Sequence, residues 1–229
     1  MRFSLFPLFS LLIFACVESG GGSAMAAEVS EDHSSLNATS PMEAQKDSLI
    51  PENADTAVLA GGCFWCLEAV FEKLDGVYEV TSGYSGGSKE TADYKTVCSG
   101  KTNHAEAVQI IYDPGQISYE ELLEVFWHVH DPTTLNRQGN DIGTQYRSAI
   151  FYLNEAQKEA AEKSMREVAT EIWEDPIVTQ IVPFEAFYPA EDYHQDYFER
   201  VGDGNPYCTY VISPKVQKFK KMFKGKLKE

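Results

Sequence analysis

The stretch Gly61-Gly62-Cys63-Phe64-Trp65-Cys66 joins a short apolar run to an amphipathic segment. The run at 56–60, Thr-Ala-Val-Leu-Ala, is typical of a buried strand. After the stretch, four apolar residues follow the i, i+3, i+4, i+7 spacing of one helix face: Leu67, Val70, Phe71 and Leu74. The sequence therefore predicts a tight turn from strand to helix, with Cys63 at the N-terminus of the helix.

Cys63 is predicted to be a nucleophile. The free N–H groups and the dipole at a helix N-terminus favour a thiolate, so we expect a lowered thiol pKa there. Gly61 and Gly62 allow the backbone to turn tightly and leave the sulfur open to a substrate. A single free cysteine is more often a buried, inert residue. The second thiol, Cys66, three residues further on, favours redox chemistry instead.

Composition limits the possible classes of function. The chain has 229 residues, of which 43% are hydrophobic, enough for one domain with a substantial core. Its formal net charge is −16. Binding to a nucleic-acid backbone needs a basic surface, so we expect no nucleic-acid partner.

The N-terminus is predicted to be an export signal. Arg2 precedes an apolar run at 3–17 that has the length of a signal-peptide core. Two processing sites compete. Ala24-Met25-Ala26 suits ordinary cleavage of a signal at 1–26, whereas Ile13-Phe14-Ala15-Cys16 resembles a lipoprotein box, with lipid attached to Cys16. The protein is therefore expected to be exported, either periplasmic or anchored to the membrane as a lipoprotein.

The segment 27–54 is predicted to be a disordered acidic tether. Its acidic side chains are opposed only by Lys46, and its other residues are largely Ser, Asn and Ala. Such a composition buries too little apolar surface to offset the entropy of ordering. The catalytic domain is expected to span 55–229.

Alternating strands and helices are predicted within this domain. Strands are expected at 77–80, 107–112, 147–153 and 177–182, with helices from 64, over 118–129 and over 154–173. Ser118 and Glu121 form a capping-box pattern before the second helix. This order predicts the α+β class, with a split βαβ (ferredoxin-like) two-layer core, helices on one face and an irregular C-terminal segment. Within that segment, 215–228 is predicted to be an amphipathic helix with its apolar edge on the core.

Two long loops are rich in glycine, aromatic and polar residues. They lie at 83–106 and 130–148. Long loops in a compact domain are commonly functional, so we expect both to contribute to the site.

Several separated motifs resemble the methionine sulfoxide reductases of type A. They are GCFW at 62–65, GYSGG at 83–87, Tyr94, VCSG at 97–100, HAEAV at 104–108, GND at 139–141, QYRS at 145–148 and AEDYHQ at 190–195. The resemblance implies reduction of the S epimer of methionine sulfoxide, free or in proteins. It also implies that no cofactor or metal is bound.

The resemblance assigns roles to individual residues. A sulfoxide sulfur accepts a thiolate only when its oxygen is protonated or strongly hydrogen-bonded. Cys63 corresponds to the nucleophile and Glu106 to the acid, a carboxyl kept protonated by an apolar pocket. Tyr94 and Tyr146 correspond to the phenols that hydrogen-bond the same oxygen, and Asp141 to a residue that holds a water or the local network.

An apolar wall for the substrate methyl group is implied as well. Phe64 and Trp65 match the residues that form it in the family. Any one of these aromatic or acidic side chains alone would be an ordinary core or surface residue. The functional prediction rests on their joint pattern.

Two cysteines compete to resolve the sulfenic acid that forms on Cys63. Position 66 is usually glycine in the family, but here it is Cys66, one helical turn from Cys63. Cys208 matches the resolving cysteine of many relatives. Because the residues after it are predicted to pack as a helix, Cys208 has less freedom to move, and we prefer Cys66. Cys98 is expected to be a structural thiol.

An external reductant must then recycle the enzyme, which we expect to act as a monomer. We predict a thioredoxin-like partner, membrane-linked or periplasmic because disulfides persist outside the cytoplasm. Two other classes were considered. A thioredoxin-like thiol-disulfide oxidoreductase would share the Cys-x-x-Cys pattern but does not require Glu106, and a zinc-binding lipoprotein would need a second ligand pair.

Overall fold

The computed structural model describes residues 50–228. The predicted signal at 1–26, the possible lipid-bearing Cys16 and most of the predicted tether at 27–54 lie outside the described residues. Among residues 50–228, no helix has the length and apolar character needed to cross a bilayer.

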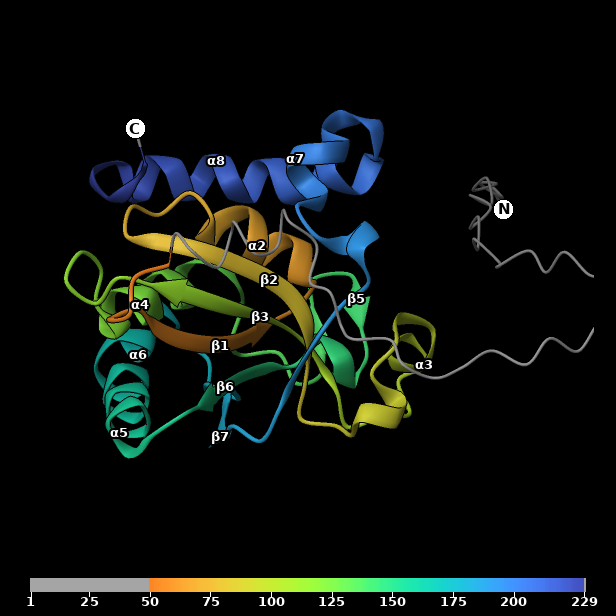
Figure 1. Ribbon diagram of the computed structural model, residues 1–229, viewed down its shortest axis with the longest axis horizontal. Coiled ribbons are helices and arrows are strands. Elements are labelled where there is room, and N and C mark those ends of the chain that lie inside the picture. The colour runs from red at the N-terminus through yellow and green to blue at the C-terminus, as the bar shows by residue number, and fades with distance from the viewer. Residues whose placement is uncertain (1–49, 229) are drawn as a thin grey trace, which may run out of the picture. The chain divides into compact units, whose positions relative to one another are not determined.

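A six-stranded sheet organises this part of the chain (Figure 1). Its strands lie in the order β7-β6-β1-β3-β2-β8. Their bounds are β1 Asp55–Gly61, β2 Val77–Ser85, β3 Ala105–Tyr112, β6 Ser148–Tyr152, β7 Gln180–Pro183 and β8 Phe187–Pro189. All neighbouring pairs are antiparallel except β6 and β7, which are parallel. With its helices, this mixed sheet confirms the predicted α+β class.

Short helices connect and cover the strands. They are α2 Phe64–Phe71, α3 Tyr94–Cys98, α4 Tyr119–Val129, α5 Glu155–Ser164, α6 Thr170–Ile172, α7 Tyr197–Val201 and α8 Ser213–Met222. The predicted capping box is present at α4, where the Ser118 hydroxyl accepts from the Glu121 N–H and the Glu121 carboxylate accepts from Ser118 N. Asn154 caps α5 by accepting from Gln157 N at 2.9 Å. The helix predicted over 154–173 is formed by α5, a π-helical turn at Met165–Ala169 and α6.

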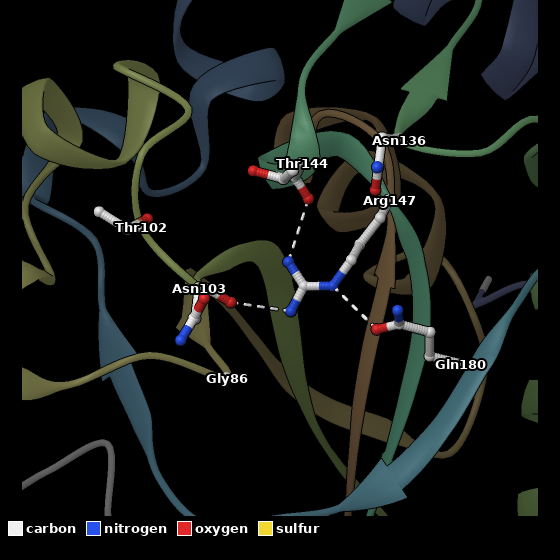
Figure 2. Close-up of a pocket in the computed structure, with 7 residues that line it drawn as sticks. All are labelled: Gly86, Thr102, Asn103, Asn136, Thr144, Arg147 and Gln180. Atoms are coloured by element: carbon white, nitrogen blue, oxygen red, sulfur yellow. Dashed lines mark hydrogen bonds between the residues drawn. The ribbon is translucent and has the colours of Figure 1, made fainter.

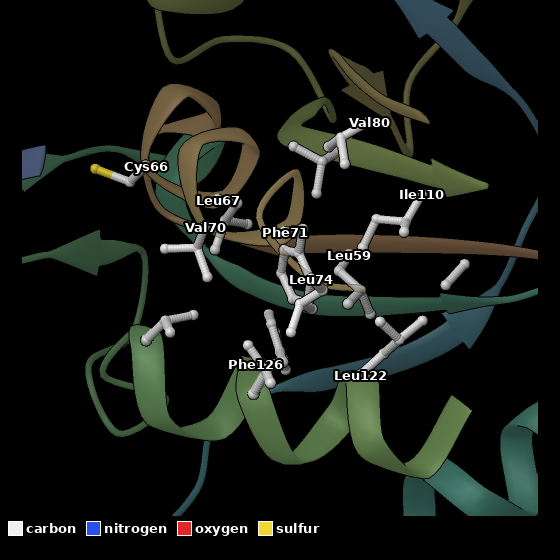
Figure 3. Packing of buried hydrophobic residues seen from close by; sticks show 14 of the residues in the cluster. Leu59, Cys66, Leu67, Val70, Phe71, Leu74, Val80, Ile110, Leu122 and Phe126 are labelled. Carbon is white, nitrogen blue, oxygen red and sulfur yellow. The ribbon is translucent and has the colours of Figure 1, made fainter. Parts of the chain in front are cut away.

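The main core lies between one face of the sheet and the helices (Figure 3). Leu59 of β1 and Ile110 of β3 are fully buried in one cluster with Leu67 of α2 and Leu122 of α4. The opposite face carries mostly small side chains and is covered by Phe184 and Phe187 rather than by helices. Complete burial of these large aliphatic side chains gives α2, and thus Cys63, a rigid support.

The strand predicted at 77–80 is longer than expected. β2 continues to Ser85, so Gly83 and Tyr84, expected in a loop, belong to the sheet. A Cβ at Gly83 would lie 2.5 Å from the Tyr188 carbonyl oxygen, so only glycine allows β8 to approach at this point. Local sequence could not show this, because β8 is about a hundred residues away.

The C-terminal helix predicted within 215–228 is confirmed. α8 buries Val216 and Phe219, and Phe223 follows immediately, each less than a tenth exposed. Met222, which shares the apolar spacing, is instead 45% exposed. The preceding residues are not wholly irregular, since they form β8, α7 and a π-helical turn at Cys208–Ile212.

Candidate active site

Cys63 lies at the junction of β1 and α2, immediately before the first residue of the helix. Gly62 adopts φ +93, and a Cβ there would come within 2.5 Å of the Gln138 side chain. Glycine at this position therefore lets the turn pack closely against Gln138. That residue belongs to the two-stranded ribbon of β4 (Arg137–Gln138) and β5 (Asp141–Ile142). The turn presents Cys63, 7% exposed, to the loops above it.

The pKa of Cys63 differs from the expectation. Burial and the neighbouring Cys66 raise the pKa of the Cys63 thiol well above its ordinary value. The hydrogen bond with Cys63, reinforced by Lys215, lowers the pKa of Cys66 to about 7 against the effect of burial. The predicted lowering of the Cys63 pKa is wrong, because desolvation of the thiol outweighs the dipole of a two-turn helix.

A cavity of about 240 Å³ adjoins Cys63. We call it the substrate cavity. Its lining residues are Cys63, Phe64, Trp65, Tyr94, Glu106, Asp141, Tyr146 and Tyr207. Seven predicted site residues thus meet in one place, although they come from sequence positions more than eighty residues apart.

Glu106 is the buried carboxyl of this cavity. It is 2% exposed, and its Oε2 accepts from Phe64 N at 3.1 Å. Burial raises the pKa of Glu106 to about 8, partly offset by the bond from Phe64. The side chain therefore remains mostly protonated at neutral pH and can donate a proton to a bound substrate.

Tyr94 and Tyr146 supply two hydroxyl groups. Burial raises the pKa of both phenols above their ordinary value, so they remain hydrogen-bond donors. Tyr94 begins α3, where its N–H donates to Glu191 Oε1 at 2.9 Å. Tyr146 ends a 3₁₀ turn that starts at Thr144.

Arg147 anchors the turn that carries Tyr146 (Figure 2). Its Nε donates to Gln180 Oε1 at 3.1 Å, and its two terminal nitrogens donate to Thr144 O and Asn103 O at 3.0 and 2.9 Å. One guanidinium thereby joins the turn to β7 and to the loop that precedes Glu106. The turn that carries Tyr146 is thus tied to the loop that leads into the strand of Glu106.

The C-terminal segment completes the apolar wall. The Trp65 indole stacks on Tyr197, with ring centroids 3.8 Å apart and planes 8° from parallel. Buried Glu68 of α2 holds α7 in place by accepting from Tyr197 N at 3.2 Å, while its other oxygen accepts from Ser82 Oγ at 2.9 Å. The wall is therefore oriented by contacts that link α2, β2 and α7.

Tyr207 is a site residue that the sequence analysis missed. Its hydroxyl donates to Asp141 Oδ2 at 2.6 Å and lies 4.0 Å from Cys66 Sγ. In the sequence, Tyr207 is marked only by its position next to Cys208, and the functional prediction concerned the cysteine. Tertiary packing alone brings this phenol beside the two thiols.

The predicted cysteines occupy different environments. None of the four in the described part of the chain forms a disulfide. Cys66 lines a separate opening beside Cys63, whereas fully buried Cys208 lies in the core and lines neither the opening nor the substrate cavity. Cys98 is half-buried at the end of α3. Within residues 50–228, no three His, Cys, Asp or Glu side chains converge as a metal site.

A buried thiol that shares its cavity with a protonated carboxyl and two phenols, next to a second thiol, is typical of a thiol-dependent reductase of an oxygen-bearing substrate. The family model described as peptide methionine sulfoxide reductase matches residues 55–227, and the chain belongs to this family. It is an oxidoreductase, a peptide-methionine (S)-S-oxide reductase that uses thiols to reduce methionine sulfoxide. The thioredoxin-like alternative is not favoured.

Individual relatives agree over most of the chain. The peptide methionine sulfoxide reductase MsrA of Saccharolobus solfataricus is 55% identical over 174 residues, which are 76% of this chain and 97% of that protein. The MsrA of Leptospira borgpetersenii is 56% identical over 167 residues, 73% and 94% of the two chains.

Solved structures are similar as well. Reduced Mxr1 from Saccharomyces cerevisiae has a TM-score of 0.64 at 37% identity, covering 68% of this chain and 90% of that one. Methionine sulfoxide reductase A of Corynebacterium diphtheriae has a TM-score of 0.61 at 34% identity, covering 70% and 80%.

The raised pKa of Glu106 predicts a specific pH dependence of stability. Between the ordinary carboxyl pKa of 4.5 and about 8, the folded protein keeps a proton that the unfolded chain loses, so stability falls as pH rises through this window. Glu106→Gln removes that contribution. Urea unfolding at pH 5 and pH 8 should show that wild type loses about 2 to 4 kcal/mol more than the variant.

Exposed Glu120→Gln is the matched control. Other buried carboxyls titrate in wild type and variant alike, so the comparison isolates Glu106. Equal pH slopes for wild type and Glu106→Gln would contradict a protonated Glu106.

Proposed function

We propose that Cys63 attacks the sulfoxide sulfur while Glu106 gives its proton to the departing oxygen. Cys63 reacts as the thiolate, which is the nucleophilic form of a cysteine. Tyr94 and Tyr146 donate hydrogen bonds to the same oxygen. The new bond between the two sulfurs then breaks as the protonated oxygen moves, as hydroxyl, to Cys63 Sγ, which leaves methionine and a sulfenic acid on Cys63. The observation that carries this mechanism is a protonated, 2%-exposed carboxyl in the same cavity as the thiol and the phenols.

The remaining cavity residues orient the substrate in this proposal. Phe64 and Trp65 form the apolar wall for the methyl group, and the stack of Trp65 on Tyr197 supports a fixed wall. Asp141 holds the local network through its bond from the Tyr207 hydroxyl. Both free methionine sulfoxide and oxidised methionines in proteins are candidate substrates.

Cys66 is the resolving thiol in the preferred scheme. It attacks the Cys63 sulfenic acid, expels water and forms a Cys63–Cys66 disulfide. Its contact with Cys63 and its position on the same helix support this role. Cys208 remains the alternative, although it lines neither the substrate cavity nor the opening beside Cys66.

An external thioredoxin-like dithiol then restores the thiols, with no bound cofactor. All proposed catalytic groups come from one chain, which supports action as a monomer.

We also infer that the four central strands form a split βαβ core, since their order β6-β1-β3-β2 and antiparallel pairing match that arrangement.

We further propose that the reductase domain at 55–229 works outside the cytoplasm. The basis is the apolar run at 3–17, followed either by a cleavage site ending at Ala26 or by lipid attachment at Cys16, with 27–54 as a tether. Cell fractionation tests this proposal. Lipidation predicts membrane-bound protein that Cys16→Ser releases into the periplasm, simple cleavage predicts periplasmic protein, and cytoplasmic retention would refute export.

The proposed acid can be tested in a single turnover. Reduced protein mixed with one equivalent of S-epimer methionine sulfoxide should release stoichiometric methionine, and the R epimer should release none. Glu106→Gln should slow the reaction by about 10² to 10⁴-fold. The wild-type rate should fall as pH rises through about 8, since Glu106 then loses its proton. Quantitative methionine analysis after rapid quenching provides the readout. A Glu106→Gln variant as fast as wild type would exclude Glu106 as the acid.

The choice between Cys66 and Cys208 predicts distinct products. After one turnover, peptide mapping by mass spectrometry should find a Cys63–Cys66 disulfide in wild type and in Cys208→Ser. Cys66→Ser should instead accumulate a Cys63 sulfenic acid that dimedone traps. A Cys63–Cys208 bond that forms in Cys66→Ser as fast as the wild-type disulfide would assign resolution to Cys208.

A further inference from the structure

Two separate openings adjoin the Cys63 turn. The substrate cavity contains Glu106, Tyr94 and Tyr146, whereas a second opening of about 290 Å³ contains Cys66 and Lys215. Cys63 lines both of them, but Cys66 lines only the second. Cys66 is thus reached through the second opening, whereas Cys63 is reached from both.

Tyr207 and Asp141 separate the two openings, since both residues line each of them. The Tyr207 hydroxyl donates to Asp141 Oδ2 at 2.6 Å and lies 4.0 Å from Cys66 Sγ. Cys66 does not line the substrate cavity, and the hydroxyl of Tyr207 is its neighbour on the boundary between the two openings. The second opening is therefore the approach to Cys66 for any external group.

The rim of the second opening is apolar and carries a cation. Tyr210 is 80% exposed and Val211 is 37% exposed, so both side chains are available for contact beside the thiol. Lys215 lines the same opening from the first turn of α8. On a chain of net charge −16, this ammonium makes the entrance locally attractive to an anionic nucleophile.

We propose that this surface, formed by Cys66, Tyr210, Val211 and Lys215, docks the Cys-x-x-Cys end of a thioredoxin-class protein. The inference rests on the proposed Cys63–Cys66 disulfide. The partner's thiolate attacks Cys66 Sγ, forms a mixed disulfide and expels Cys63 as thiolate. The partner's second thiol then attacks the mixed disulfide, leaves oxidised as an internal disulfide and returns Cys66 to the thiol state.

Charge and shape both fit this occupant. The incoming thiolate is negative and meets Lys215, while Tyr210 and Val211 offer apolar contact to the surface around the partner's cysteines. A small thiol would use the opening but would gain little from the exposed side chains. Reduction by a protein dithiol should therefore depend on Tyr210, and reduction by dithiothreitol should not.

The test uses full-length protein oxidised by one equivalent of S-epimer methionine sulfoxide. Its disulfide is then reduced either by thioredoxin with thioredoxin reductase and NADPH or by dithiothreitol. Tyr210→Ala should lower the ratio of the thioredoxin rate to the dithiothreitol rate by about three- to tenfold. Lys215→Glu should slow the thioredoxin reaction about tenfold at low ionic strength, and added salt should reduce this difference.

Lys220→Glu on the exposed side of α8 makes the same charge change away from the opening and should leave both rates unchanged. The proposal is overturned if Tyr210→Ala keeps the wild-type ratio, or if Lys215→Glu and Lys220→Glu slow thioredoxin equally. Failure of the proposed function is a different result, because wild type would then release no methionine before any reductant is added.

Discussion

The hydrogen bond from Phe64 N to Glu106 Oε2 connects the two halves of the site. It joins the first residue of α2 to the start of β3 at 3.1 Å, in a fully buried position. A neutral carboxyl can accept this bond and still present its own proton to the cavity. The same contact fixes the turn that carries Cys63. Nucleophile and acid are therefore positioned by one interaction, and the surrounding core keeps water from competing for it.

Burial determines the protonation state of the groups around this bond. It raises the pKa of Glu106 to about 8, and it raises the pKa of Glu68 to about 7, although Ser82 and Tyr197 donate to Glu68. The same desolvation opposes a thiolate at Cys63, whereas the hydrogen bond with Cys63 lowers the pKa of the Cys66 thiol. Burial of these carboxyls lowers the free energy of unfolding as pH rises above the ordinary carboxyl pKa. The same burial keeps Glu106 protonated, and thus able to act as an acid, at neutral pH.

The C-terminal part of the chain encloses the site that contains Cys63 and Glu106. Tyr197 stacks on Trp65, and Tyr207 reaches Asp141 between the two openings. α8 holds these segments against the core by burying Phe219 and Val216. The same packing buries Cys208 completely, and this thiol lines neither of the two openings.

Much of this protein could be predicted from its sequence. The spacing of Leu67, Val70 and Phe71 predicted α2, the Ser118–Glu121 pattern predicted the start of α4, and the motif around Cys63 identified the chemistry, because these signals are local. Contacts between distant segments were decided by the tertiary structure alone. Only packing shows that β2 extends to pair with β8, that Tyr207 enters the site, and that burial raises rather than lowers the pKa of Cys63. Desolvation and long-range pairing depend on which residues surround a group, and no local pattern contains that information.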